Sequence, residues 1–213
     1  MSDFSDSAVF PPFAELPPAG ASSTGADGST ASTSSTTTKA GSGGWFLLAQ
    51  IKEDMTITKP TLIVTDRAGV DFAVTFEDAG LNLRGDLGAR KGYTLVVPGA
   101  RRTDREGKKA VVRVEAGRGG QVRRLWANGF LVGPPEQVIP GSLEQVLELG
   151  RVIGSETVGK QCAACGKTGG PLMRCKGCST ASYCSKACQV NGWSELGHKS
   201  NCKVLKSIRE IWA

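Results

Sequence analysis

The stretch Cys162–Cys202 reads CAACGKTGGPLMRCKGCSTASYCSKACQVNGWSELGHKSNC and contains all seven cysteines and the only histidine of the 213-residue chain. The spacing of these residues is C-x2-C-x9-C-x2-C-x5-C-x3-C-x9-H-x3-C. Eight soft ligands can fill two tetrahedral zinc shells. An odd number of cysteines, set in close pairs with a histidine, favours zinc over a disulfide framework. We therefore expect this stretch to fold around two structural zinc ions.

The eight ligands fall into four pairs, which are Cys162/Cys165, Cys175/Cys178, Cys184/Cys188 and His198/Cys202. A tight turn in a CxxC pair aims two sulfurs at one ion. In the last two pairs three residues separate the ligands, which puts them one helical turn apart on one face. We expect two knuckles followed by a helical half. Sequential and interleaved sharing of the ions both remain open, because only five residues separate Cys178 from Cys184.

The central segment Cys175–Trp193, CKGCSTASYCSKACQVNGW, resembles a MYND-type zinc finger. In such fingers an aromatic residue precedes the fifth ligand, as Tyr183 does here. A glutamine and a tryptophan follow the sixth ligand, as do Gln189 and Trp193. One departure is the segment 194–197 between the tryptophan and the histidine, which is longer than the family commonly has.

The resemblance implies interleaved ligation of two Zn²⁺. One ion would be held by Cys162, Cys165, Cys184 and Cys188, and the other by Cys175, Cys178, His198 and Cys202. It also implies an adaptor that binds short proline-containing segments, often of PxLxP type, in transcriptional or ubiquitin pathways. The implied peptide-binding residues are Ser179, Tyr183, Gln189 and Trp193.

Residues 45–132 have the pattern of a small β-domain. Short β-branched or alternating runs occur at 45–51, 61–65, 70–76, 93–97 and 110–114. Five strands with an irregular piece between the third and fourth resemble an OB-fold, and a generic small barrel or sandwich is the alternative. The predicted fold class is therefore a mainly β, OB-like barrel followed by the two-zinc finger with short helices.

The basic residues are concentrated in two segments. Residues 90–124 hold eleven Lys/Arg against three Asp/Glu, and residues 162–213 hold eight against two. An OB-fold has a recognition loop between its fourth and fifth strands, so this position gives candidate nucleic-acid-binding residues Arg101, Arg102, Arg105, Lys108 and Lys109. Few aromatic residues accompany them, so we favour peptide binding over nucleic-acid binding.

The remaining segments are expected to be simpler. Residues 1–44 are rich in Pro, Ser, Thr and Gly, and we expect a disordered tail. Within it, residues 10–18 (FPPFAELPP) are rich in proline, which favours a polyproline II conformation. This segment is predicted to be either a docking peptide or a spacer. Residues 133–161 form a connector.

Two short helices are predicted in the C-terminal third. In the connector, Ser142 and Gln145 offer a capping box, and Gly150 ends the expected helix. Residues 203–213 form an amphipathic helix, with apolar residues at i, i+1, i+4, i+7 and i+8. This helix is expected to cap the finger or the β-domain.

Enzymatic and membrane functions are not expected. Zinc takes the only histidine, and no phosphate-binding glycine loop occurs, so no catalytic machinery is recognised. No run approaches the length of a membrane helix. The acidic start, without Lys or Arg, argues against a secretory signal, so we expect a nuclear or cytoplasmic protein that is not secreted.

Overall fold

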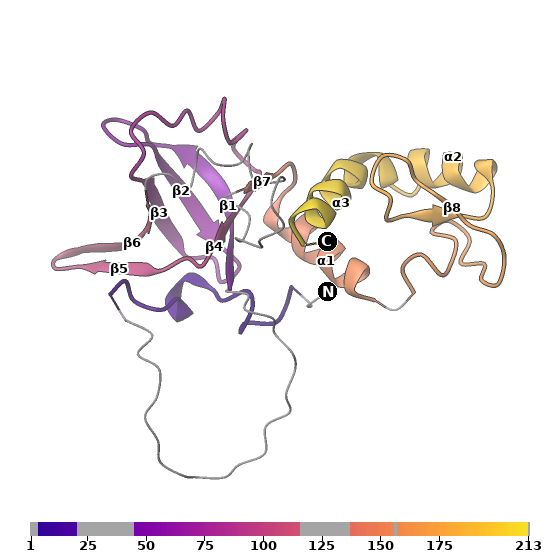
Figure 1. Ribbon diagram of the computed structural model, residues 1–213, viewed down its shortest axis with the longest axis horizontal. Helices are drawn as coiled ribbons and strands as arrows, with labels where there is room; N and C mark the ends of the chain where they lie inside the picture. Colours follow the sequence, from indigo (N-terminus) through magenta and orange to yellow (C-terminus); the bar gives the residue numbers. More distant parts are fainter. Residues whose placement is uncertain (1–3, 21–44, 116–136, 156, 213) are drawn as a thin grey trace, which may run out of the picture.

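The computed structural model describes residues 4–20, 45–115, 137–155 and 157–212. Three parts follow one another along the long axis: a β-sheet, a pair of packed helices, and the cysteine-rich finger (Figure 1). No helix in these ranges is both long and apolar enough to cross a bilayer. The predictions made for residues 21–44 and 116–136 fall outside the described residues.

The sheet has seven strands in the order β5-β6-β3-β2-β1-β4-β7. All neighbours are antiparallel except β3 and β6, which run parallel. The strand bounds are Phe46–Asp54 (β1), Thr61–Asp66 (β2), Asp71–Phe76 (β3), Thr94–Pro98 (β4), Arg102–Arg105 (β5), Lys108–Val114 (β6) and Gln137–Ile139 (β7). The five predicted strands are therefore present, and β5 and β7 were not predicted.

The sheet is open, so the predicted closed OB-like barrel is not confirmed. No described pairing joins β5 at one end to β7 at the other. The basic segment 101–109 was expected to be the recognition loop of an OB-fold. Most of it instead belongs to the antiparallel hairpin of β5 and β6. Gly107, at φ +65°, supplies the left-handed turn residue of that hairpin.

Alternation in β2 and β3 builds the core on one face of the sheet. Leu62, Val64, Phe72, Val74 and Phe76 are buried there, whereas the residues between them are half-buried. A second face, with Leu48 and Val96, packs against the helices.

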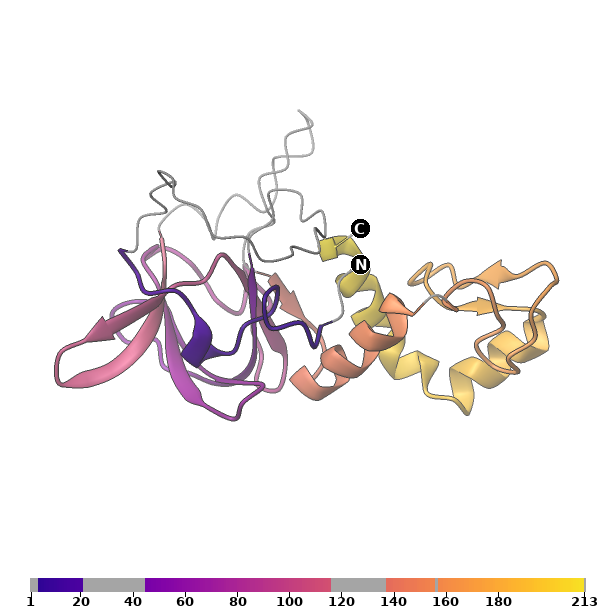
Figure 2. The ribbon, with the colours of Figure 1, turned by 90° about the horizontal axis from the view of Figure 1, so that it is seen from below.

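The N-terminal segment 4–20 is packed, which differs from the expected disordered tail. Phe13 stacks on Phe72 with ring centroids 4.1 Å apart, and Phe10 lies against Phe46 at 6.0 Å. The backbone of Pro17 accepts a hydrogen bond from the amide of Arg102. The prediction of disorder relied on the composition of residues 1–44 as a whole, in which these few aromatic residues carry little weight. Their burial removes enough apolar surface from water to order the short segment that contains them. Figure 2 shows the segment running along the sheet.

Helix α1 (Leu143–Gly154) begins at the predicted cap. Ser142 accepts a hydrogen bond from the amide of Gln145 at 3.2 Å. The Gln145 side chain does not close the box but donates to Asn201 of α3 (His198–Trp212) at 2.6 Å. The helix also runs past Gly150, which was predicted to end it. That glycine lies under Phe4, where a Cβ would come within 2.3 Å of the ring, so it is a point of close packing and not the end of the helix.

Helix α3 joins the finger to the sheet. Its Val204, Leu205 and Ile208 are buried in one cluster with α1, the outer face of the sheet and four of the cysteines. Trp212, at its end, packs against Phe4 and Phe10 at centroid distances of 4.8 and 5.8 Å. The predicted C-terminal helix therefore starts earlier than residue 203 and contacts both finger and sheet.

Phe10→Ala tests the packing of the N-terminal segment. Because Phe10 is 3% exposed among three aromatic rings, the change should lower the free energy of unfolding by about 3–5 kcal/mol in a denaturant titration. The control Ile57→Ala, at a residue 88% exposed, should change it by less than about 0.5 kcal/mol. Equal effects of the two variants would contradict the packed segment.

Candidate metal centres and their surroundings

Two knuckles carry the first four cysteines. In the first, Gly166 at φ +72° follows Cys165 and donates its amide to the Cys162 carbonyl at 2.8 Å. In the second, Ser179 at φ +57° follows Cys178 and donates to the Cys175 carbonyl at 2.7 Å. The hairpin β8 (Met173–Arg174) and β9 (Ser182–Tyr183) flanks the second turn. The predicted knuckles are therefore present.

The helical half differs in detail from the expectation. Helix α2 (Lys186–Ser194) begins after its cap Ser185, which accepts from the amide of Cys188 at 3.1 Å. Cys184 thus precedes the helix, and only Cys188 lies in it. His198 and Cys202 both lie in the first turns of α3, one turn apart as predicted.

The structure brings the eight ligand atoms together in two groups of four. The groups are Cys162, Cys165, Cys184, Cys188 and Cys175, Cys178, His198, Cys202, with ligand atoms within 4.8 Å of one another in each. Each group takes one pair from the first half of the finger and one from the second. This is the interleaved arrangement that the resemblance implied.

The spacing within each group suits a tetrahedral zinc ion. Zn–S bonds of about 2.3 Å place the corners of a tetrahedron about 3.8 Å apart. The Cys165–Cys184 and Cys184–Cys188 sulfurs are each 3.6 Å apart, and Cys175–Cys202 are 3.8 Å apart. His198 Nε2 lies 3.3 Å from the sulfur of Cys175 and 3.7 Å from that of Cys178. The cysteines are free thiols, so each group can hold one zinc ion.

The thiol electrostatics of the first group favour a cation. Burial raises the pKa of Cys162, but backbone amides of Cys184, Cys165 and Ala164 outweigh it and bring the pKa to about 6. Hydrogen bonds with the sulfurs of Cys188, Cys165 and Cys162 raise the pKa of Cys184 to about 12. The Cys162 thiol therefore ionises readily, because backbone amides stabilise its thiolate, whereas the Cys184 thiol keeps the proton that it shares with neighbouring sulfurs. A divalent cation displaces the remaining protons.

The two groups differ in their exposure. All four residues of the Cys175 group are buried. In the Cys162 group, Cys165 is exposed and Cys184 and Cys188 are half-buried. An ion held by the Cys162 group would therefore lie closer to solvent than one held by the Cys175 group.

Two glycines make room around the second group. A Cβ on Gly177 would lie 2.8 Å from the Cys202 sulfur, and one on Gly192 would lie 2.5 Å from the ring of Tyr183. Tyr183 in turn contacts the edge of His198, with ring centroids 5.9 Å apart. These supporting glycines were not predicted, because spacing shows the ligands but not what packs on them.

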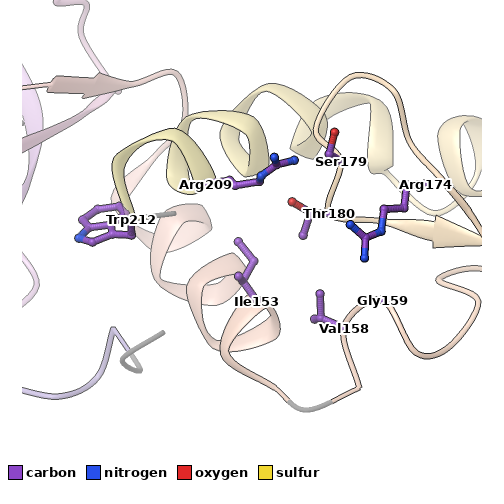
Figure 3. A pocket seen from close by; sticks show the side chains of 8 residues that line it. All are labelled: Ile153, Val158, Gly159, Arg174, Ser179, Thr180, Arg209 and Trp212. Carbon is purple, nitrogen blue, oxygen red and sulfur yellow. The ribbon is translucent and has the colours of Figure 1, made fainter. Parts of the chain in front are cut away.

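The predicted peptide-binding residues do not form one surface. Tyr183 is 1% exposed, so its ring cannot face a peptide. Trp193 is 42% exposed and lines a groove of about 870 Å³ with Gly177 and the lysines of α3. Ser179 lines a different cleft of about 230 Å³, shown in Figure 3. Gln189 is half-buried on α2 and lines neither cleft.

The predicted nucleic-acid-binding residues are largely engaged within the chain. Arg101 lies over the ring of Trp45 at 5.7 Å, and Arg102 donates to the Ala14 carbonyl at 2.8 Å. Arg105 donates to the Lys109 carbonyl at 2.7 and 3.1 Å, which holds the hairpin turn. The side chains of Lys108 and Lys109 are exposed.

Cys184→Ser tests the interleaved grouping. It should reduce the metal content from two ions to about one per chain and leave the Cys175 group loaded. Cobalt substitution distinguishes the groups, because the remaining spectrum should be that of a three-thiolate, one-imidazole site. Cys178→Ser is the matched change and should leave a four-thiolate spectrum. The opposite assignment of the two spectra would contradict the grouping.

Chelation should remove the two ions in order. The exposed Cys162 group should lose its ion first, and the buried Cys175 group more slowly. Hydrogen exchange should then report opening of α2 and α3, while the amides of β2 and β3 stay protected, because the sheet has its own core. Simultaneous loss of both ions and of sheet protection would contradict this order.

Comparisons with known proteins place the finger in a family. Residues 162–202 match the family described as "MYND finger". A 38-residue segment is 50% identical to human histone-lysine N-methyltransferase SMYD3, covering 18% of this chain and 8% of that protein. A 47-residue segment is 40% identical to Arabidopsis thaliana ubiquitin carboxyl-terminal hydrolase 19, covering 22% and 6%. The chain thus spans less than a tenth of these relatives, and residues 162–202 are a MYND-type zinc finger.

Proposed function

We propose that this protein is a zinc-dependent adaptor that binds proline-containing segments of other proteins in the groove beside Trp193. The observation that carries the proposal is an exposed tryptophan on a scaffold held by two metal clusters. One edge of the Trp193 ring faces His198, with centroids 5.8 Å apart, so the ligand group helps to fix the ring. A fixed aromatic surface suits an extended proline-rich segment, which loses little entropy on docking.

Apolar exposure near this groove supports a protein partner. Val190 is 57% exposed, Trp193 42% and Leu196 52%, all within one short stretch of the finger. Clustered apolar side chains of this kind are typical of interaction sites. Gly177 also lines the groove, and its missing side chain lets this part of the wall lie directly over the Cys202 sulfur.

The charge of the groove constrains the partner. Lys199, Lys203 and Lys206 of α3 line it, and of these only Lys206 has an acidic partner, Glu210 at 3.7 Å, among the described residues. Acidic residues next to the proline motif would therefore strengthen binding through charge complementarity. The two relatives are a histone-lysine methyltransferase and a ubiquitin hydrolase, which supports a role in transcription or ubiquitin pathways.

A catalytic role is not proposed. His198 Nε2 points at the sulfurs of Cys175 and Cys178, so it is occupied as a ligand rather than placed to act as a base. The zinc shells have four protein ligands each, which leaves no position for substrate.

We also propose that the sheet is related to the OB-type barrel. Strand β1 pairs with both β2 and β4, β3 is parallel to β6, and β4 and β5 are consecutive with three residues between them. The missing feature is a pairing that closes the barrel. Nucleic-acid binding by this part is the alternative function, and the internal contacts of Arg101, Arg102 and Arg105 weigh against it.

Trp193→Ala on the full, zinc-loaded chain tests the proposal. Binding of a PxLxP peptide should weaken at least about tenfold, because an interface aromatic is lost, with two zinc ions per chain retained. Val152→Ala, at a residue of α1 that is 52% exposed and outside the groove, is the matched control and should bind normally. If both variants bind the peptide equally, the groove is not the site.

A further inference from the structure

The finger has a second cleft, which shares no lining residue with the Trp193 groove. It is formed where the end of α1, the turn at Val158, strand β8 and the C-terminal half of α3 meet (Figure 3). Its volume is about 230 Å³, room for one side-chain head group and its neighbour rather than for a nucleotide.

Two arginines enter this cleft from opposite sides. Arg174 comes from β8 and Arg209 from α3, and the Thr180 side chain lies between them in Figure 3. Neither arginine forms an ion pair with a carboxylate of the described residues. The Arg209 guanidinium donates a long hydrogen bond of 3.5 Å to the Cys178 carbonyl. Two guanidinium groups at one small cleft form a binding position for an oxyanion.

The second knuckle forms the floor between the two arginines. Thr180 lies there, and its hydroxyl donates to the Cys178 carbonyl at 3.2 Å. Ser179 stands at the edge of the cleft with its hydroxyl pointing away from Thr180 and Arg174 in Figure 3. Ser179 has φ +57°, a region that residues other than glycine adopt at a cost, and the corresponding position of the first knuckle holds Gly166, at φ +72°. Glycine would therefore suit this turn better than serine.

The rest of the wall is apolar. Ile153, Val158 and Trp212 line the cleft opposite the polar groups. A free inorganic anion would gain nothing from these side chains. A peptide residue with an anionic head group, followed by an apolar neighbour, would use both halves.

We propose that this cleft binds an anionic side chain of a partner polypeptide, a phosphorylated serine or threonine or a carboxylate, beside an apolar residue. The two guanidinium groups would form charge-assisted hydrogen bonds to its oxygens. This site is separate from the Trp193 groove, so a partner can engage one cleft without the other.

The first experiment titrates the zinc-loaded full chain with inorganic phosphate, and separately with acetate, followed by ¹H–¹⁵N NMR. The Nε–H signals of Arg174 and Arg209 and the amide of Ser179 should shift together. Arg174→Gln and Arg209→Gln should each weaken binding about tenfold, as expected when a charge-assisted bond is lost. Lys176→Gln removes an exposed cation on the same knuckle that does not line the cleft, and should change nothing.

Ser179→Gly is the control for the turn itself. Glycine relieves the strained turn, so the melting temperature should stay the same or rise, and the phosphate affinity should not change because the hydroxyl points away from the arginines. Shifts spread over the lysines of α3, or an effect of Lys176→Gln as large as that of Arg174→Gln, would overturn the proposal in favour of diffuse attraction.

Three short peptides show which anionic side chain the cleft binds. They share one apolar sequence and differ at a single position, which holds phosphoserine, glutamate or serine. The phosphoserine or the glutamate peptide should bind at least about tenfold more tightly than the serine peptide. If phosphate binds and neither peptide exceeds the serine version, the result is an adventitious ion only, and the proposal fails. Trp193→Ala should leave these affinities intact, so failure here is distinguishable from failure of the proline-peptide groove.

Discussion

The interleaved sharing of two metal positions is the constraint on which the finger depends. Each group of four ligands takes one knuckle from the first half and one pair from the second half. Neither half can therefore satisfy a tetrahedral shell alone, and the knuckles, the hairpin and both helices must form together. The finger is too short to build a hydrophobic core of its own that would stabilise it. Metal coordination therefore supplies the stability that a larger domain gains from its core.

The same constraint sets the direction of α3 and, through it, the relation between finger and sheet. The helix begins at His198, a ligand, and carries Val204 and Ile208 into the cluster that includes Leu48 of the sheet. Cys175, Cys178 and Cys202 lie in that cluster as well. The metal positions and the hydrophobic core are thus parts of one packed unit, and the aromatic residues of segment 4–20 cover its junction with the sheet.

The Cys175 knuckle contributes to two unlike clefts of the finger. Gly177 lines the groove beside Trp193, whereas Ser179 and Thr180 line the cleft that Arg174 and Arg209 enter. One groove is aromatic and lined by lysines, and the other cleft is lined by arginines. Both clefts include residues of the same knuckle turn, so the shape of each depends on that turn.

The sequence by itself determined the ligands, their number and the knuckles, because metal coordination ties residue type and spacing to local geometry. It also determined the five strands and the cap at Ser142, which follow from alternation and from local hydrogen bonding. Only the tertiary structure decided that the sheet is open, where Gly150 lies, and that residues 4–20 pack on the sheet. It likewise separated Ser179 from Trp193 and buried Tyr183. These outcomes depend on contacts between residues far apart in the chain, which neither periodicity nor composition records.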